Sequence, residues 1–155
     1  MVRLALYQPD IPQNTGTLLR LGACLNISID IIGPTGFDMS DKALRRAGMD
    51  YLQTTNVTRH ISFAHFIDKY QGAAQRVILT TTKAKKNYTE FTFRTNDIIL
   101  LGRESAGVPE SVVKEVDESV TIPMQRDVRS LNIAVAGAMI IGEALRQTEG
   151  FPKPC

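Results

Sequence analysis

Cysteine is scarce in this sequence, and no uncharged apolar run is long enough to cross a membrane. The two cysteines, Cys24 and Cys155, lie far apart and form no CxxC pair, which argues against a disulfide framework or a zinc site and favours a reducing compartment. The longest apolar run, Leu131–Gly142, falls well short of the roughly 20 residues that a membrane-spanning helix needs. The N-terminus enters a strand-like run at once and lacks the apolar core and cleavage site of a signal peptide. We therefore expect a cytoplasmic protein.

Several familiar catalytic and nucleotide-binding motifs are missing as well. His60 and His65 lack HExxH spacing and a neighbouring cysteine, which argues against a metal site. No GxSxG nucleophile elbow is present. The glycine turn that begins at Gly102 carries Val108 and Pro109 where a P-loop needs Lys and Ser or Thr, and it does not match the GxGxxG dinucleotide pattern.

The composition is that of an ordinary globular protein. The chain has 155 residues, of which 43% are hydrophobic and 22% charged, and this length fits one domain over residues 1–155. Its net charge is +2 and its pI is near 8.6. Such a balance permits an anionic partner without requiring one.

Short β-rich runs alternate with helical patterns, which predicts an α/β domain with a mostly parallel sheet flanked by helices. Gly48 suits the position after a helix end, and Pro109 suits the first turn of a helix. The polar, basic stretch Lys83–Asn96 is predicted to be a surface loop. The predicted strands are Arg3–Tyr7, Ile27–Ile32, Val57–Ile61, Arg76–Thr81, Asp97–Leu101 and Ser119–Ile122. The predicted helices are Thr15–Leu25, Ser40–Ala47, Phe63–Tyr70, Glu110–Val116 and Leu131–Gln147.

The last predicted helix carries no polar side chain from Ile133 to Gly142. A helix at a protein surface would show a polar stripe, so this one is expected to be covered on nearly all sides. A second subunit is the favoured cover, since a C-terminal helix should lie outside the sheet. Burial within a single chain is the alternative.

The segment Pro12–Arg20 is the first candidate site. Asn14 is predicted to cap the helix that begins there. Gly16 and Arg20 are four positions apart and share a face, and an arginine above a bare backbone patch at a helix start suits phosphate binding. A capped helix with a solvated arginine explains the local pattern about as well.

Two further candidates follow in the last third of the chain. In the turn Gly102–Glu110, backbone amides lie open to a ligand, and Glu104 would attract a cationic group such as a sulfonium; a purely structural turn is the alternative. Ser130 is predicted to cap the last helix and Asn132 to sit in its first turn. Taken alone, this last pattern is capping chemistry and no more.

Taken together and in order, these segments resemble the SPOUT (SpoU–TrmD) RNA methyltransferases, and most closely the TrmL-like group of tRNA (cytidine(34)-2′-O)-methyltransferases. The resemblance spans nearly the whole chain, and the co-occurrence of its motifs is far more specific than any one of them. The matching residues are Leu6–Gly16, Arg20, Asp41, Lys42, Arg45–Gly48, Val57–His60, the glycine turn, Ile122–Met124 and Arg129–Asn132.

The resemblance implies a fold and a cofactor. The C-terminal part of the parallel sheet would be tied in a deep trefoil knot, which the usual rule against threaded chains would not suggest. The protein would be a homodimer, in agreement with its apolar last helix. S-adenosylmethionine would bind bent within the knot, held largely by backbone groups. Its expected contacts are Leu79, Thr80, Thr81, Gly102, Ile122, Met124, Ser130 and Leu131.

The resemblance also implies the reaction: 2′-O-methylation of the wobble nucleotide, cytidine or uridine 34, in the anticodon loop of leucine tRNAs. No metal is needed, because the sulfonium already activates the methyl group, and aligning the hydroxyl behind it lowers the barrier. Arg20 matches the catalytic arginine, which is often assigned as the base. Because a guanidinium normally stays protonated, it would have to be strongly perturbed, or else orient the substrate while another group takes the proton. The expected catalytic residues are Arg20, Asn14, Glu104, Ser130 and Asn132.

Two departures and two alternatives remain open at this point. Several relatives have Ser in place of Ala134 and Tyr in place of Gly142, which affects the expected tRNA or dimer contacts. The substrate could instead be another RNA such as ribosomal RNA, or the chain could be a knotted dimer that binds RNA or a nucleotide without turnover. The basic groups Lys42, Arg45, Arg46, Lys83, Lys85 and Lys86 are usually just solvated in such runs, but they could contact RNA phosphates.

Overall fold

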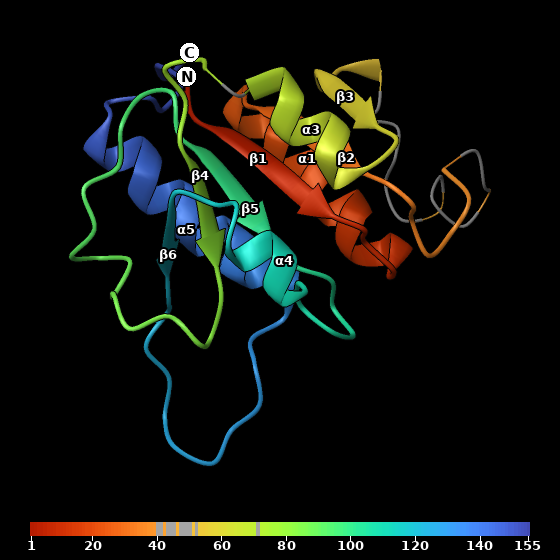
Figure 1. The fold of residues 1–155 in the computed structure, drawn as a ribbon. Coiled ribbons are helices and arrows are strands. Elements are labelled where there is room, and N and C mark those ends of the chain that lie inside the picture. Colours follow the sequence, from red (N-terminus) through yellow and green to blue (C-terminus); the bar gives the residue numbers. More distant parts are fainter. Residues whose placement is uncertain (40–41, 43–45, 47–50, 52, 71) are drawn as a thin grey trace.

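The computed structural model describes residues 1–39, 42, 46, 51, 53–70 and 72–155. Its centre is a six-stranded sheet in the order β3-β2-β1-β5-β4-β6, with every neighbouring pair parallel (Figure 1). The α/β architecture with a parallel sheet is therefore confirmed. The strands are β1 (Arg3–Tyr7), β2 (Ser28–Ile32), β3 (Val57–His60), β4 (Val77–Thr80), β5 (Ile98–Leu101) and β6 (Glu118–Val120).

Helices cover both faces of this sheet, as a buried parallel sheet requires. Because successive strand residues point to opposite faces, β5 sends Ile99 and Leu101 to one side and Ile98 and Leu100 to the other. The first face packs against α1 and α5, and the second against α3 and α4 (Figure 1). The helices are α1 (Pro12–Leu25), α3 (Phe63–Tyr70), α4 (Glu110–Val113) and α5 (Ile133–Gln147). In the part of the chain that the structure describes, no helix is long and apolar enough to cross a bilayer.

Two predicted helix starts, those of α1 and α5, are wrong. Helix α1 begins at Pro12 with Ile11 as its N-cap, so Asn14 lies inside the first turn. Proline suits that first position because its φ is already helical and its missing N–H would have no partner there. Asn132, not Ser130, caps α5 by accepting hydrogen bonds from the backbone N–H of Ala134 and of Val135.

Two other predicted helices also differ from the structure or lie outside it. Helix α4 ends at Val113 rather than Val116, and Pro109 is its N-cap instead of a residue of its first turn. Its backbone at Pro109 is extended, with ψ at 161°, so the helix cannot include that residue. The predicted helix Ser40–Ala47 and its expected terminator Gly48 fall largely outside the described residues.

The loop between β4 and β5 is not only a surface loop. Phe91 and Phe93 are 5% and 4% exposed and belong to the core that contains α5. The Gln147 side chain at the end of α5 donates to the Phe91 carbonyl (2.9 Å) and accepts from the Phe93 amide (2.8 Å). The loop therefore packs across the far end of α5, which its polar sequence did not reveal.

Helix α5 is buried on one face and exposed on the other. The buried face comes very close to its neighbours, since a Cβ at Gly137 would lie 2.9 Å from side-chain atoms of both Leu18 and Leu101. On the opposite face, Val135 and Met139 are 49% and 38% exposed. Burial of the whole helix within one chain, the alternative considered above, is therefore wrong.

A buried polar network holds one end of the sheet to α3. Asp30 on β2 is fully buried and accepts hydrogen bonds from Arg3 Nε (2.9 Å) and from the Tyr70 hydroxyl (2.8 Å), while His60 Nε2 lies 2.7 Å away. Burial, followed by the hydrogen bond to Asp30, raises the pKa of Tyr70 to about 12. One carboxylate thus satisfies groups from β1, β3 and α3.

We expect Asp30→Asn to lower the free energy of unfolding by about 3 kcal/mol, because it removes the counter-charge of the half-buried Arg3 and one of the carboxylate oxygens that three buried partners share. Urea unfolding monitored by circular dichroism measures the change. The exposed Asp68 on α3 provides the control, and Asp68→Asn should change stability by less than about 0.5 kcal/mol. Equal stabilities for the two variants would show that the network contributes nothing.

Candidate functional site

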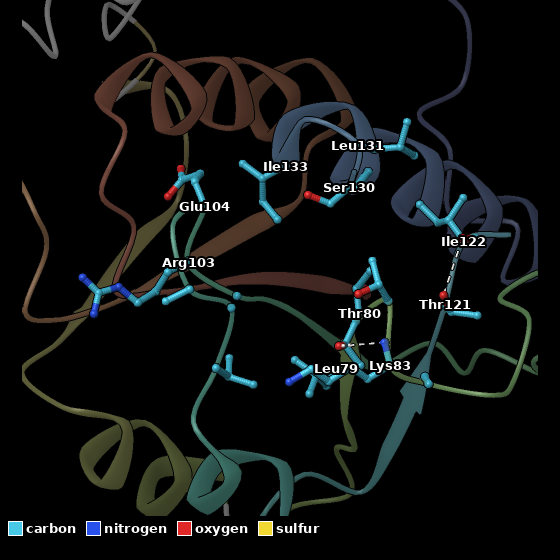
Figure 2. Close-up of a pocket in the computed structure, with 18 of the residues that line it drawn as sticks. Leu79, Thr80, Lys83, Arg103, Glu104, Thr121, Ile122, Ser130, Leu131 and Ile133 are labelled. Carbon is cyan, nitrogen blue, oxygen red and sulfur yellow. Dashed lines mark hydrogen bonds between the residues drawn. The ribbon is translucent and has the colours of Figure 1, made fainter. Parts of the chain in front are cut away.

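A cavity of about 870 Å³ opens at the carboxyl ends of β4, β5 and β6. Its walls come from the residues that follow these strands, from the β1–α1 connection and from the segment that enters α5 (Figure 2). The chain order reverses at this edge, because β1 is flanked by β2 on one side and β5 on the other. In open α/β sheets, ligands bind at such a switch point.

The structure brings nearly all the predicted site residues to this one cavity. Among the predicted catalytic residues, Asn14, Glu104, Ser130 and Asn132 line it. The eight residues predicted to hold the cofactor also line it, namely Leu79, Thr80, Thr81, Gly102, Ile122, Met124, Ser130 and Leu131.

Arg20 is the exception. Its side chain is exposed and is not among the residues that line the cavity of its own chain. The guanidinium carbon lies 5.6 Å from the centre of the Tyr51 ring, a distance that allows a cation–π interaction. The phosphate-binding face expected around Gly16 also does not form, since Gly16 is buried.

The asparagines join the two ends of the chain at the cavity. Asn132 Nδ2 donates to Asn14 Oδ1 over 3.0 Å, while Asn132 Oδ1 caps α5. This side chain therefore fixes the start of α5 against α1. Asn132 thus has the helix-capping role that the sequence analysis assigned to Ser130.

The glycine turn depends on two residues without side chains. Arg103 and Gly107 exchange backbone hydrogen bonds of 3.0 and 2.9 Å, and Gly107 has a φ of +63°. A Cβ on Gly102 would lie 2.9 Å from the Gly107 backbone. Glycine at both positions lets the turn fold back tightly and present Glu104 to the cavity.

Asp10, which the sequence reading missed, is joined to this turn. Its backbone N–H donates to Glu104 Oε2 (3.0 Å), and its carboxylate accepts from the Ser105 hydroxyl. The neighbouring Glu104 side chain is the main cause that lowers the pKa of Asp10, and burial is the main cause that raises the pKa of Glu104. The position of Asp10 in the chain could have identified it. Asp10 follows β1, and the neighbouring strand β5 leads directly into the glycine turn.

The remaining walls suit a ligand with both apolar and polar parts. Leu79, Ile122 and Ile133 give apolar surface, and Lys83, predicted as a loop charge that could contact RNA phosphates, lines one side (Figure 2). Thr80 Oγ1 is buried and has no hydrogen-bond partner among the described residues. Within the same described ranges, no group of three or more His, Cys, Asp and Glu side chains could hold a metal ion.

Comparison with known proteins gives consistent results. The tRNA (cytidine(34)-2′-O)-methyltransferase of Beijerinckia indica is 55% identical over 150 residues, which cover 97% of this chain and 94% of that protein. The enzyme of the same name from Escherichia coli K12 is 37% identical over 154 residues, or 98% and 96% of the two chains.

The solved structures that resemble this chain are also RNA methyltransferases. A protein studied for 2-OH methylation of C/U34 on tRNA superposes with a TM-score of 0.89 at 40% identity, over 95% of both chains. An AdoMet-bound rRNA methyltransferase from Sinorhizobium meliloti has a TM-score of 0.85 at 26% identity, over 94% of this chain and 56% of that one. The model of the SpoU rRNA methylase family matches residues 1–142. This chain belongs to the SpoU rRNA methylase family.

Proposed function

We propose that this protein transfers a methyl group from S-adenosylmethionine to the ribose 2′-oxygen of nucleotide 34, a cytidine or uridine, in the anticodon loop of tRNA. One observation carries the proposal: a single cavity collects eleven of the twelve residues predicted for the cofactor and for catalysis, all but Arg20. Relatives that are 55% and 37% identical over almost the whole chain are named for this reaction.

The cavity fits the proposed cofactor. Its apolar wall at Leu79 and Ile122 suits the adenine ring, and the Thr80 hydroxyl, which has no partner among the described residues, can form a hydrogen bond with a ligand. When bound, S-adenosylmethionine supplies a methyl group already activated by its sulfonium. The chain's own residues would then hold the ribose hydroxyl in line, with Asn14 and Ser130 as the polar groups at that end of the cavity.

We also propose that the enzyme works as a homodimer in the cytoplasm. Leu131, Val135 and Met139 form an exposed apolar stripe, 37%, 49% and 38% exposed, at the start of α5. A second copy that packs against this stripe would remove it from water. The cavity opens beside the same segment, because Leu131 belongs to both surfaces.

The position of Arg20 supports an active site made by two copies. Arg20 is exposed and away from the cavity of its own chain, so a single protomer lacks the guanidinium that the reaction is proposed to use. We propose that it acts on the RNA bound at the partner's cavity. It would orient the phosphate and the hydroxyl, since a guanidinium remains protonated.

The predicted trefoil knot belongs to this proposal too. The loop between β4 and β5 is tied to α5 through Gln147, and Asn87 of that loop pairs with Thr121 beyond β6. These contacts support a chain end that passes beneath the loop. They also explain how the cavity can draw on the residues after both β4 and β6.

Mass spectrometry of tRNA nucleosides tests the function. Cells that lack the gene should lose one 2′-O-methylated nucleoside at position 34 of leucine tRNAs, and purified protein with S-adenosylmethionine should restore it. Loss from ribosomal RNA instead would move the activity to another substrate. If no methylated nucleoside changes and the protein does not bind the cofactor in calorimetry, the chain is a binding protein.

Arg20→Ala should reduce kcat by at least about 100-fold, because the hydroxyl is no longer held in line. The affinity for S-adenosylmethionine should stay nearly unchanged, as Arg20 does not line the cavity. Steady-state kinetics and calorimetry measure the two effects. Equal loss of binding and turnover would show a structural role for Arg20.

A mixed dimer tests which copy supplies Arg20. One subunit carries Arg20→Ala, the other Glu104→Gln, and two different tags select dimers that contain both. If each variant alone is inactive, the mixed dimer should recover about half of the wild-type activity, since one of its two sites is intact. A mixed dimer without activity would place Arg20 and Glu104 in the same chain's site.

Val135→Glu should convert the dimer to monomers, because a carboxylate would be buried in the proposed apolar interface. Sedimentation velocity gives the oligomeric state. The matched control, Ser111→Glu, places the same charge on the exposed surface of α4 and should leave the dimer intact. A dimeric Val135→Glu variant would mean that the interface lies elsewhere.

A further inference from the structure

We infer that a small hollow beside the cofactor cavity binds the base of the methylated pyrimidine nucleotide, with Arg103 as a hydrogen-bond donor to the O2 atom of that base. This assignment rests on the proposed function and adds the place of the substrate base. The hollow has a volume of about 250 Å³ and is lined by Tyr7, Arg103, Ala106, Gly107, Val108 and Pro109. Sites for whole small molecules usually measure about 300–1,000 Å³, so the hollow suits a single base better than a second cofactor.

The hollow and the larger cavity share one wall, the glycine turn. Arg103, Ala106, Gly107 and Val108 line both. A Cβ on Gly107 would have no atom within 4 Å among the described residues, its chain neighbours apart, so the space beside the turn is open there. A ribose in the larger cavity carries its base on a single bond, and the base must therefore lie in an adjoining space. The hollow provides that space.

The hollow also lies on the side of the cavity that the cofactor leaves free. Leu79 and Ile122 form the proposed adenine wall. Figure 2 shows Arg103 and Glu104 across the cavity from Ile122, with the Arg103 side chain directed away from that wall. The substrate would thus approach from the Arg103 side.

The lining favours an uncharged planar ring over a phosphate group. Ala106, Val108 and Pro109 present apolar groups, and Tyr7 is only 7% exposed. The Tyr7 ring packs edge-on against Phe63, with 5.9 Å between the ring centres, which holds it in place. Walls of this kind bind an unstacked base, whereas a phosphate would lose its water against them.

Arg103 lacks the partners that hold a structural arginine of this chain. Arg76 donates from Nε and Nη2 to the two carboxylate oxygens of Asp97, over 2.9 and 2.7 Å. The Arg103 side chain has one hydrogen bond among the described residues, from Nη1 to Gln8 over 3.4 Å, and its Nε has none. Its Nη2 lies 3.9 Å from Asp10 Oδ2, too far for a hydrogen bond. The Arg103 guanidinium therefore keeps N–H donors for a ligand.

Gln8 places this guanidinium at the end of β1. Its φ is +41°, a left-handed backbone conformation that costs energy for a residue other than glycine. The Gln8 amide donates to the Ile32 carbonyl over 2.8 Å, and its side-chain oxygen accepts the hydrogen bond from Arg103. Strained residues of this kind collect at ligand sites, where the surrounding structure keeps a side chain in a fixed position.

The chemistry of the two target bases identifies the atom that Arg103 contacts. A guanidinium only donates hydrogen bonds. At position 4, cytosine carries an amino donor and uracil a carbonyl acceptor, so a fixed donor cannot serve both bases there. Both bases carry an acceptor at O2. A donor at O2 therefore binds cytidine and uridine alike, as the proposed reaction at nucleotide 34 requires.

The O2 contact is tested with leucine tRNA that carries uridine, 2-thiouridine or 4-thiouridine at position 34. Sulfur accepts hydrogen bonds poorly, so 2-thiouridine should lower the wild-type kcat/KM at least about tenfold. 4-Thiouridine is the matched control and should behave as uridine does, because its sulfur replaces the oxygen that Arg103 does not contact.

Arg103→Met should lower kcat/KM with uridine at least about tenfold, and it should no longer distinguish uridine from 2-thiouridine. A merely structural role of Arg103 would lower activity but leave that preference in place. The control variant Arg94→Met, at an exposed position before β5 and so at the opposite end of the sheet, should match the wild type with all three substrates.

Three outcomes overturn the assignment. The first is a wild type that uses 2-thiouridine as well as uridine. The second is an Arg103→Met variant that keeps the full preference for uridine, because the sulfur would then act through the ribose conformation. The third is a loss in Arg103→Met that disappears when the phosphates beside nucleotide 34 are replaced by uncharged methylphosphonates, since Arg103 would then bind the RNA backbone.

Fluorescence anisotropy with labelled anticodon stem-loops makes the same comparison without turnover. A protein that prefers uridine to 2-thiouridine through Arg103, yet transfers no methyl group, would overturn the proposed function and support the base site. Stem-loops that bind without this preference, or that do not bind, would overturn the base site whether or not the methyl group is transferred.

Discussion

The close seating of α5 against α1 and the sheet is the constraint on which the rest of the structure depends. Gly137 allows this approach, since any side chain there would collide with Leu18 and Leu101. Asn132 fixes the start of the helix by capping it and by bonding to Asn14. Gln147 fixes its end against the loop that follows β4. Without this seating, Ser130 and Leu131 would not form one wall of the cavity.

This arrangement separates the tasks of the polar residues. Asn132 is used for fold geometry, because both of its side-chain ends are occupied by protein groups. Glu104 is brought to the cavity by a turn that two glycines close, and Asp10 holds it there. Arg20 stays outside, against Tyr51. A protomer thus contains the proposed cofactor pocket, and a second copy would supply the guanidinium.

The exposed apolar face of α5 explains why the dimer and the site are proposed together. Helix α5 has no polar side chain from Ile133 to Gly142, yet it buries only one side within its own chain. The exposed side begins at Leu131, which also lines the cavity. An interface on that side would lie next to the site, so that assembly and catalysis would depend on the same apolar stripe.

The sequence by itself determined the parallel α/β sheet, the position of every described strand to within about two residues, and the segments that meet at the cavity. The sheet and its strands follow from local rules, since strand alternation, glycine turns and apolar periodicity act over a few residues. The segments that meet at the cavity followed instead from the resemblance to the SPOUT methyltransferases. Tertiary structure alone decided the rest. Which of Ser130 and Asn132 caps α5 depends on the approach of Asn14 from the other end of the chain. The burial of Phe91 and Phe93 depends on the place of α5. The contact of Asp10 with Glu104 joins residues 94 positions apart, and no local pattern encodes such a pairing until β1 and β5 lie side by side.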